Sequence, residues 1–308
     1  MRILVIGTGS IGRRHINNLL KIGAEVFCYD RDMPLLEKTI NEYNIKAYDF
    51  RSHHLQMDAY VICVPPNYHT PFMFEALDHN AHIFVEKPIS NNLDRLDELI
   101  KNVKQQKRVL MVGYQLRYNN GLRYIKEIID SEELGRILTI RAEYGNYLPN
   151  WHKEDYHKLY TGHKNEGGGI ILDASHEIDY CNWLVGKPVI EVKSMMAKLS
   201  SLDIDVEDTA DILLRFDNDS IANIHLDMID KEYKRKCTIV LEKGTIHWNI
   251  TSNFPVIVNG QPKYFEKDDE YVLEMIDFID RVNGKLIPES DKDLSLETLK
   301  ICLQALNR

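Results

Sequence analysis

The stretch ILVIGTGSIG, residues 3–12, decides the fold that this sequence predicts. Its first four residues are all apolar, which is typical of a parallel strand buried on both faces. The glycine-rich half leads directly into residues 13–20, where isoleucine and leucine recur at helical spacing. A strand, a glycine-rich turn and a helix in this order predict the first unit of a dinucleotide-binding fold.

Each glycine of this turn has its own expected task. Gly7 permits the tight turn, Gly9 lets backbone amides approach a pyrophosphate, and Gly12 lets the helix pack closely on the strand. The amino end of the helix stabilises the phosphate charge. The residues expected to bind the cofactor here are Gly7, Gly9, Ser10, Ile11 and Gly12.

The next predicted strand, residues 25–29, ends at Asp30, eighteen residues beyond Gly12. A carboxylate at this position can accept hydrogen bonds from the adenosine ribose, and it repels a 2′-phosphate. NAD is therefore the expected cofactor. The positive charge of Arg31 leaves NADP as an alternative, and a helix cap for residues 33–43 is an alternative role for Asp30.

A further predicted strand, residues 57–64, closes with a proline turn at the same sheet edge. The amides of Asn67, with His69 nearby, are expected to frame the nicotinamide end of the cofactor, and Pro65 shapes the turn. Ordinary turn and helix-cap chemistry accounts for these residues equally well.

The run from Ile83 to Val85 ends in Glu86-Lys87-Pro88. Proline cannot continue a strand ladder, and it restricts the preceding residue to extended geometry. Lys87 is therefore expected at the carboxyl end of a strand, where open α/β sheets bind their ligands. Glu86 and Lys87 are both expected near the cofactor, the alternative being an exposed ion pair before a turn.

Beyond Tyr114 the pattern changes from alternating strands and helices to successive strands. The predicted fold class is α/β, with an amino-terminal Rossmann domain over residues 1–116. An α+β domain with a large, open, mostly antiparallel sheet is expected over residues 117–308, and its last helix could pack back on the first domain. The predicted strands are residues 137–146, 189–198, 210–216, 221–228, 236–241 and 245–249.

Asp173, His176 and Asp179 recur at intervals of three, so they would share one face of a helix. An imidazole flanked by carboxylates is a candidate acid or base with a raised pKa. The triple glycine at 167–169 would let the backbone pass close to a ligand or to the other domain. A capped helix with polar residues at the surface is the alternative.

Metal binding is not expected from this sequence. Tyr180 stands where a zinc motif beginning at His176 would need its second histidine. His152, His157 and His163 form a loose cluster without paired cysteines or regular ligand spacing.

The composition sets limits on the partners and the compartment. A chain of 308 residues is expected to form two domains that share a cleft. Its net charge of -9 is spread over interleaved acids and bases, so neither nucleic acid nor an anionic membrane is an expected partner. No apolar run approaches the roughly 20 residues of a membrane span. The five widely spaced cysteines indicate reduced thiols and a cytoplasmic protein.

Taken together, these motifs resemble the glucose-fructose oxidoreductase and inositol dehydrogenase family, Gfo/Idh/MocA. The resemblance implies a Rossmann domain followed by an open-sheet domain that is often used for oligomerisation, here as a homodimer or homotetramer. It also implies hydride exchange between nicotinamide and a sugar or cyclitol carbon, with Lys87 and His176 near the reacting hydroxyl. The motifs that carry it are Gly7 to Gly12, Pro65-Pro66-Asn67 with His69, Glu86-Lys87-Pro88, Gly113 to Tyr118, and Gly167 to Asp179.

One departure from the family pattern concerns the substrate. Many members have three residues between the aspartate and the histidine, whereas only two separate Asp173 from His176. The shorter form resembles members of bacterial surface-sugar pathways, which leaves the role of Asp173 open. The segment from Trp151 to Tyr156, together with Tyr160, looks like the substrate loop of that subgroup.

The resulting hypothesis is a dehydrogenase or ketoreductase acting on a nucleotide-linked or amino sugar. His176 would accept the hydroxyl proton, Lys87 would hydrogen-bond the oxygen or relay the proton, and Asp179 or Asp173 would orient the imidazole. A free inositol or polyol dehydrogenase and a non-catalytic dinucleotide-binding regulator are the alternatives. Substrate contacts are expected from Arg117, Trp151, Tyr156 and Tyr160.

Overall fold

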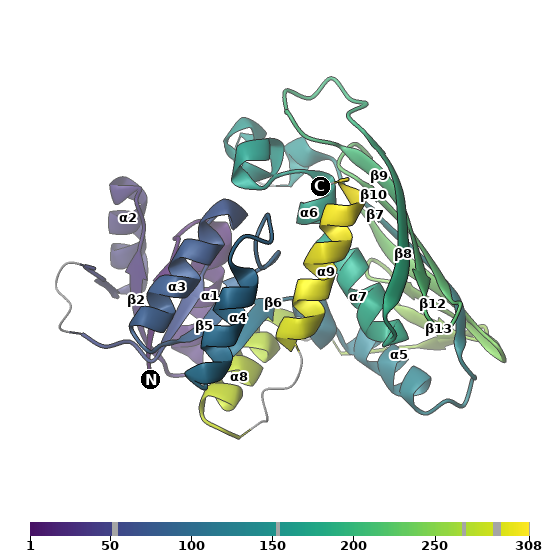
Figure 1. Ribbon diagram of the computed structural model, residues 1–308, viewed down its shortest axis with the longest axis horizontal. Coiled ribbons are helices and arrows are strands. Elements are labelled where there is room, and N and C mark those ends of the chain that lie inside the picture. Colours follow the sequence, from purple (N-terminus) through teal and green to yellow (C-terminus); the bar gives the residue numbers. More distant parts are fainter. Residues whose placement is uncertain (51–54, 152–154, 267–268, 286–290, 308) are drawn as a thin grey trace. The chain divides into compact units, whose positions relative to one another are not determined.

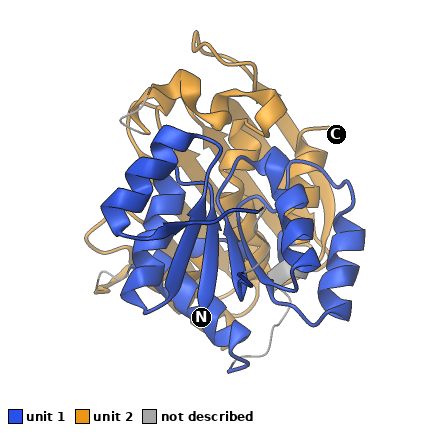
Figure 2. Ribbon diagram, turned by 90° about the vertical axis from the view of Figure 1, so that its left-hand side faces the viewer, with its two compact units in different colours: residues 1–115, 269–295 blue, residues 116–268, 296–308 orange. Residues whose placement is uncertain are grey.

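The computed structural model describes residues 1–50, 55–151, 155–266, 269–285 and 291–307. It divides into two compact units (Figure 2). The first unit contains residues 1–115 and 269–295, and the second contains residues 116–268 and 296–308. Each unit is therefore built from two separate pieces of chain.

The first unit is organised around a six-stranded parallel sheet (Figure 1). The strand order β3-β2-β1-β4-β5-β6 is that of a doubly wound dinucleotide-binding fold. The four residues from Ile3 to Ile6 are fully buried, as expected for a strand covered on both faces. The strands are β1 (Arg2–Ile6), β2 (Glu25–Tyr29), β3 (Lys46–Ala47), β4 (Ala59–Ile62), β5 (His82–Glu86) and β6 (Leu110–Gly113).

Helices connect these strands, and one helix returns from the far end of the chain. The connecting helices are α1 (Ser10–Lys21), α2 (Met33–Tyr43), α3 (His69–Asp78) and α4 (Leu96–Gln105). Helix α8 (Glu270–Val282) packs on α1 and buries Met275 and Phe278 completely. Because β1 lies between β2 and β4, successive crossovers leave β1 in opposite directions. Ligands of open α/β sheets bind at the carboxyl end of such a pair of strands.

The second unit contains an eight-stranded mixed sheet of order β14-β13-β12-β11-β7-β10-β9-β8. Only the β7–β10 pair is parallel among the described strands of this sheet, and the other neighbours are antiparallel. The fold class expected from the sequence is thus confirmed. The strands are β7 (Ile137–Gly145), β8 (Val189–Ala197), β9 (Thr209–Phe216), β10 (Ile221–Asp227), β11 (Lys234–Leu241), β12 (Gly244–Asn249), β13 (Val256–Val258) and β14 (Gln261–Lys263).

The helices of the second unit lie on one face of this sheet (Figure 1). Strand β9 shows why: Ala210, Ile212, Leu214 and Phe216 are buried in alternation with exposed residues, so only one face is apolar. The helices are α5 (Asn120–Asp130), α6 (Ile170–Asp173), α7 (Ser175–Val185) and α9 (Asp291–Ala305), of which the part from residue 296 belongs here. None of the helices among the described residues combines the length and apolar character needed to cross a bilayer.

Candidate functional site

The glycine turn after β1 has the geometry needed to receive a phosphate. Gly7 has a φ of +91°, and a Cβ on it would lie 2.6 Å from the carbonyl oxygen of Cys63. A Cβ on Gly12 would overlap the carbonyl oxygen of Gly7, whereas a Cβ on Gly9 would meet nothing within 4 Å. The fold itself therefore requires Gly7 and Gly12, and Gly9 leaves the backbone open to a ligand.

The amino end of α1 offers donors to that ligand. Gly9 is the N-cap residue, and no described side chain caps this helix end. Gly9 and Ser10 are exposed, and Ile11 is half-buried. The first N–H groups of a helix have no partner within it, and the helix dipole favours an anion there. These observations fit the pyrophosphate of a dinucleotide, so Ser10 and Ile11 stay predicted cofactor contacts.

Asp30 is held at the end of β2 by the same turn. Its Oδ2 accepts hydrogen bonds from the backbone N of Thr8 at 2.6 Å and from the Thr8 hydroxyl at 2.9 Å. The helix-cap alternative for Asp30 is wrong, because Asp32 is the N-cap of α2 and accepts from Leu35 N. Arg31 donates to the Tyr68 hydroxyl at 3.4 Å, and its guanidinium lies 5.5 Å from the centre of that ring.

The turn after β4 contributes one polar group that suits a ligand. Pro65 precedes the short 3-10 helix η1 (Pro66–Tyr68), and Asn67 is half-buried within it. The side-chain oxygen of Asn67 is buried without a hydrogen-bond partner in the described part of the chain. A buried acceptor of this kind is costly unless a donor reaches it. A cofactor amide or hydroxyl would satisfy it.

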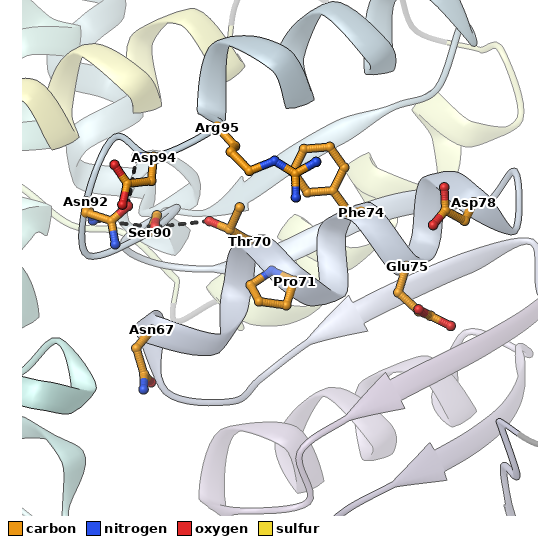
Figure 3. Close-up of a pocket in the computed structure, with 10 residues that line it drawn as sticks. All are labelled: Asn67, Thr70, Pro71, Phe74, Glu75, Asp78, Ser90, Asn92, Asp94 and Arg95. Atoms are coloured by element: carbon orange, nitrogen blue, oxygen red, sulfur yellow. Dashed lines mark hydrogen bonds between the residues drawn. The ribbon is translucent and has the colours of Figure 1, made fainter.

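A hollow of about 370 Å³ lies between α3 and the segment that leads to α4. Figure 3 shows the residues that line it. Arg95 lies over the ring of Phe74 at 4.0 Å, and Thr70 donates to the Ser90 hydroxyl at 3.2 Å. Of the predicted site residues, Asn67 alone lines this hollow. The hollow is therefore a neighbour of the proline turn, and Lys87 and the glycine turn lie outside its lining.

His69 lies in the interior and does not present its side chain to a ligand. It has no exposed surface, and its ring nitrogens lie 2.8 Å from Val64 O and 2.9 Å from Pro88 O. Burial lowers the pKa of its imidazole. A neutral ring donates through one nitrogen at a time, and a carbonyl oxygen lies within reach of each nitrogen. His69 therefore links the turn after β4 to the loop after β5. His69, which was expected close to the nicotinamide end of the cofactor, thus points into the interior of the first unit.

Glu86 is likewise turned inward at the end of β5. One carboxylate oxygen lies 2.6 Å from His15 Nε2, and the other accepts from the backbone N of Lys87 at 3.3 Å. A Cβ on Gly113 would come within 3.2 Å of this carboxylate, so glycine makes room for it. The alternative of an exposed Glu–Lys pair is wrong, because Glu86 is buried. Lys87 is half-buried at the carboxyl edge of the sheet, as expected.

In the second unit, Asp173 and His176 belong to different helices. Helix α6 ends at Asp173, Ala174 interrupts the helical geometry, and α7 begins at Ser175. The prediction of one continuous helical face is therefore wrong for Asp173. Its carboxylate accepts from the Tyr160 hydroxyl at 2.6 Å, which ties it to the preceding loop.

The triple glycine serves this local packing. A Cβ on Gly168 would overlap the carbonyl oxygens of Tyr160 and Thr161, and one on Gly169, with a φ of +110°, would overlap the Glu207 carboxylate. Glu207 in turn accepts from the amide of Ile171 at 3.2 Å. The close approach expected at these glycines is thus made to other segments of the second unit.

Asp179 lies one turn beyond His176 on α7 and is committed to Arg117. The guanidinium of Arg117 donates to both carboxylate oxygens, at 2.9 and 2.5 Å, and Thr298 donates at 3.3 Å. The side chains of Arg117 and Asp179 are only 10% and 2% exposed. Arg117 therefore holds α7 through Asp179, a contact that sequence reasoning did not foresee when it assigned Arg117 to the substrate.

His176 is almost fully buried on α7, next to a second ion pair. The Arg235 Nε lies 2.8 Å from the Glu177 carboxylate, and the guanidinium covers the ring of Tyr144 at 4.5 Å. Burial opposes the charge of Arg235, but the Glu177 carboxylate raises its pKa. Two buried ion pairs thus fix the helix that carries His176, which is the kind of rigid support that a catalytic group needs.

The predicted substrate loop is built from short turns around Trp151, Tyr156 and Tyr160. Trp151 donates to Asn146 O at 3.0 Å, and the Tyr156 hydroxyl accepts from Asp203 N at 3.3 Å. Tyr156 and Tyr160 lie in the 3-10 helices η4 (Tyr156–Lys158) and η5 (Tyr160–Gly162), and η6 (Lys164–Glu166) follows. Trp151, Tyr156 and Tyr160 stay predicted substrate contacts.

Of the histidine cluster, His157 and His163 belong to the described residues. His163 contacts the His157 carbonyl oxygen at 2.8 Å, and His152 lies outside the described residues. Within the described ranges, no group of three or more histidine, cysteine, aspartate or glutamate side chains is arranged to hold a metal ion.

Sequence reasoning missed two side chains that shape the site, Thr8 and His15. His15 lies three residues beyond Gly12, on the face of α1 that packs against the sheet, and this spacing was a usable signal. Thr8 carried no such signal, because its partner Asp30 is distant in sequence.

Comparison with known proteins agrees with this geometry. Residues 1–114 match the model of the oxidoreductase family with an NAD-binding Rossmann fold, and residues 122–247 match the GFO/IDH/MocA C-terminal domain. Myo-inositol 2-dehydrogenase of Thermotoga maritima is 30% identical over 239 residues, which are 73% of this chain and 67% of that protein. An inositol 2-dehydrogenase/D-chiro-inositol 3-dehydrogenase of Lacticaseibacillus casei is 32% identical over 194 residues, which are 60% of this chain and 53% of that protein.

The match thus spans about half the length of the Lacticaseibacillus relative. Among solved structures, the WlbA dehydrogenase from Bordetella pertussis, in complex with NADH and UDP-GlcNAcA, has a TM-score of 0.88 at 22% identity. The superposition covers 100% of this chain and 95% of that chain. At this identity the likeness shows the fold.

The glycine turn, the acid after β2 and the parallel sheet define a protein with an NAD-binding Rossmann domain. With its second, open-sheet domain, the chain belongs to the Gfo/Idh/MocA family of oxidoreductases. The family resemblance seen in the sequence is therefore confirmed.

Proposed function

We propose that this protein transfers hydride between a nicotinamide dinucleotide and a hydroxyl- or keto-bearing carbon of a sugar, with NAD as the cofactor. The observation that carries this proposal lies in the first unit. Lys87 stands at the carboxyl edge of the parallel sheet, and Glu86 holds its backbone amide. The same edge carries the open backbone at Gly9 and the uncapped end of α1.

Oxidation of an alcohol requires loss of the hydroxyl proton as hydride leaves the same carbon. The nicotinamide ring, when bound, supplies the hydride acceptor. We assign the proton to His176 and the stabilisation of the developing oxyanion to Lys87, whose ammonium group donates to the oxygen or relays the proton. In the reverse direction the same two groups return the proton to the keto oxygen.

The two acids near His176 have unequal roles in this proposal. Arg117 and Thr298 already engage Asp179, which fixes α7 in the second unit. Asp173 is bound by Tyr160, a member of the predicted substrate loop. We therefore assign Asp179 to the position of the helix that carries His176, and Asp173 to the link between the substrate loop and the region of the acid/base.

A nucleotide-linked or amino sugar is the proposed substrate. Two observations support it: the short spacing between Asp173 and His176, and the likeness over nearly the full chain to a WlbA dehydrogenase that holds UDP-GlcNAcA. A free inositol or polyol is the second candidate, favoured by relatives named as inositol dehydrogenases. A screen of nicotinamide absorbance with UDP-sugars and with myo-inositol separates the two.

A cytoplasmic homodimer or homotetramer is the proposed form of the protein. All five cysteines are free and buried, which suits a reducing compartment. The solvent face of the large sheet exposes apolar side chains, including Met195 at 81% and Ile221 at 45%. Exposed apolar surface of this kind favours self-association. Light scattering on the purified protein measures the number of subunits.

Paired substitutions test the catalytic assignment. Lys87→Ala and His176→Ala should each lower kcat by ~10²–10⁴. The Kd for NADH should change by less than about twofold, because neither the Lys87 amine nor the His176 imidazole is assigned to the phosphates of the cofactor. Lys101→Ala and His247→Ala, at exposed positions of the same two units, are matched controls that should keep full turnover. Full turnover in either active-site variant would remove that residue from the mechanism.

A further inference from the structure

The carboxylate of Asp30 is already hydrogen-bonded at three points within the first unit. Thr8 donates to Oδ2 through its amide at 2.6 Å and through its hydroxyl at 2.9 Å, and the amide of Asp32 donates to Oδ1 at 2.9 Å. A carboxylate oxygen has about two lone-pair positions. Oδ2 is therefore saturated by Thr8, and Oδ1 keeps one position for a ribose hydroxyl.

Thr8 connects this acid directly to the phosphate-binding turn. It lies between Gly7 and Gly9 and has no exposed surface, so water cannot replace its hydroxyl. The Gly7 amide is bonded in turn to Tyr29 O at 2.9 Å, beside Asp30. The distance between the pyrophosphate amides and the ribose acceptor is thereby fixed before a ligand arrives.

Arg31 is the cation that could compensate a 2′-phosphate, and it has a competing partner. Its Nη1 donates to the Tyr68 hydroxyl at 3.4 Å, and its guanidinium lies 5.5 Å from the centre of the Tyr68 ring. Both residues are exposed. To pair with a 2′-phosphate, Arg31 would have to give up both contacts, which disfavours NADP further.

We propose that Thr8 is a positioning residue that sets the preference for NAD over NADP by holding the Asp30 carboxylate, and that Tyr68 reinforces it by engaging Arg31. The proposal rests on dinucleotide binding by the Rossmann domain. It does not depend on the sugar chemistry proposed above.

Removal of the Thr8 hydroxyl is the informative perturbation. Thr8→Val keeps the shape and the backbone donor but places a methyl group against the carboxylate, whereas Thr8→Ser keeps the hydroxyl. A hydrogen bond to a charged group that is buried on one side is worth enough to shift binding about tenfold. Thr8→Val should therefore weaken NADH binding about tenfold and leave NADPH binding nearly unchanged.

The measurement is a fluorescence titration of the full chain with NADH and with NADPH, in the absence of any sugar. Wild type and Thr8→Ser should share the same ratio of the two Kd values, with NADH bound more tightly. In Thr8→Val the Kd for NADPH divided by the Kd for NADH should fall about tenfold, because only the Kd for NADH rises. Tyr68→Phe should tighten NADPH binding about threefold, because only the hydroxyl contact to Arg31 is lost.

Three results would overturn the proposal: equal affinity of the wild type for both cofactors, a ratio in Thr8→Val within twofold of wild type, or a Thr8→Ser variant as impaired as Thr8→Val. If Thr8→Val does not fold, Thr8→Ala removes the same hydroxyl with less bulk and is judged by the same ratio. Binding is measured without turnover, so an inactive but correctly discriminating protein would count against the sugar chemistry alone.

Discussion

Asp179→Asn should destabilise the second unit by about 3–5 kcal/mol. The substitution leaves the Arg117 guanidinium, which is 10% exposed, facing an amide in place of a carboxylate that bonded it at two points. A buried charge without its partner costs more than the pair contributed, because water cannot solvate it. For a unit of this size the loss corresponds to a fall in Tm of roughly 10 °C.

Tryptophan fluorescence isolates this effect. All three tryptophans, Trp151, Trp183 and Trp248, belong to the second unit, so their emission during urea unfolding reports that unit without the Rossmann domain. The exposed Asp203→Asn is the matched control and should change the free energy of unfolding by less than about 0.5 kcal/mol.

The double variant distinguishes the loss of the Arg117–Asp179 ion pair from a nonspecific loss of stability. Arg117→Met with Asp179→Asn removes both charges, so it should recover at least about 2 kcal/mol relative to the sum of the single changes. A loss below about 1 kcal/mol in Asp179→Asn, or strict additivity in the double variant, would refute the reasoning. The activity per folded molecule of Asp179→Asn then decides whether Asp179 also orients the imidazole of His176.

Two further predictions follow from the glycine turn and from the sheet. Gly9→Ala should leave the free energy of unfolding within about 0.5 kcal/mol of wild type but weaken NADH binding at least about tenfold. Gly12→Ala should lower the free energy of unfolding itself, because its Cβ would overlap a backbone oxygen. Equal thermal stability of the two variants would contradict this. The hydrogen bond to Asp227 raises the pKa of His225 to about 9; desolvation opposes this shift and Asp211 adds to it. The protonated His225 therefore stabilises the fold fully below about pH 6.5, and this contribution is lost as the pH rises to about 9. Since the side chain is 38% exposed, the contribution should be about 1 kcal/mol. The free energies of urea unfolding of wild type and His225→Asn should differ by that amount at about pH 6 and converge at about pH 10.

Sequence reasoning located the elements because their signals are local. The buried run before Gly7 and the alternation in β9 each follow from side-chain periodicity, and they give the right fold class. The parallel pairing of β7 with β10 is not local, since it joins residues 137–145 to residues 221–227. The sequence predicted a mostly antiparallel sheet, and the identity of its parallel pair had to be seen in the structure.

The site shows the same division between local and distant contacts. Lys87 was placed at the sheet edge from its own neighbours, because a strand followed by proline fixes its position. Glu86 and His69 were expected near the cofactor, and the side chains of both turn inward. Strand β5 is buried on both faces, so alternation could not tell which side carries a ligand. The partners that decide their direction, His15 and Pro88, are defined only by tertiary packing.

The helix break at Ala174 has a similar origin. Three polar residues at intervals of three predict one helical face, and α7 keeps that pattern for His176 and Asp179. Asp173 departs from it because Tyr160 and the packing of the triple glycine hold the preceding turn. Such contacts between segments outweigh a weak local preference.

The interrupted path of the chain also sets an order for folding in the cell. A ribosome adds about 5–20 residues per second, so α8 emerges roughly 10 to 30 seconds after the last strand of the parallel sheet. During that interval the surface of α1 on which α8 packs is not covered by that helix. The nucleotide-binding unit of this protein is therefore completed only after most of the second unit has been synthesised.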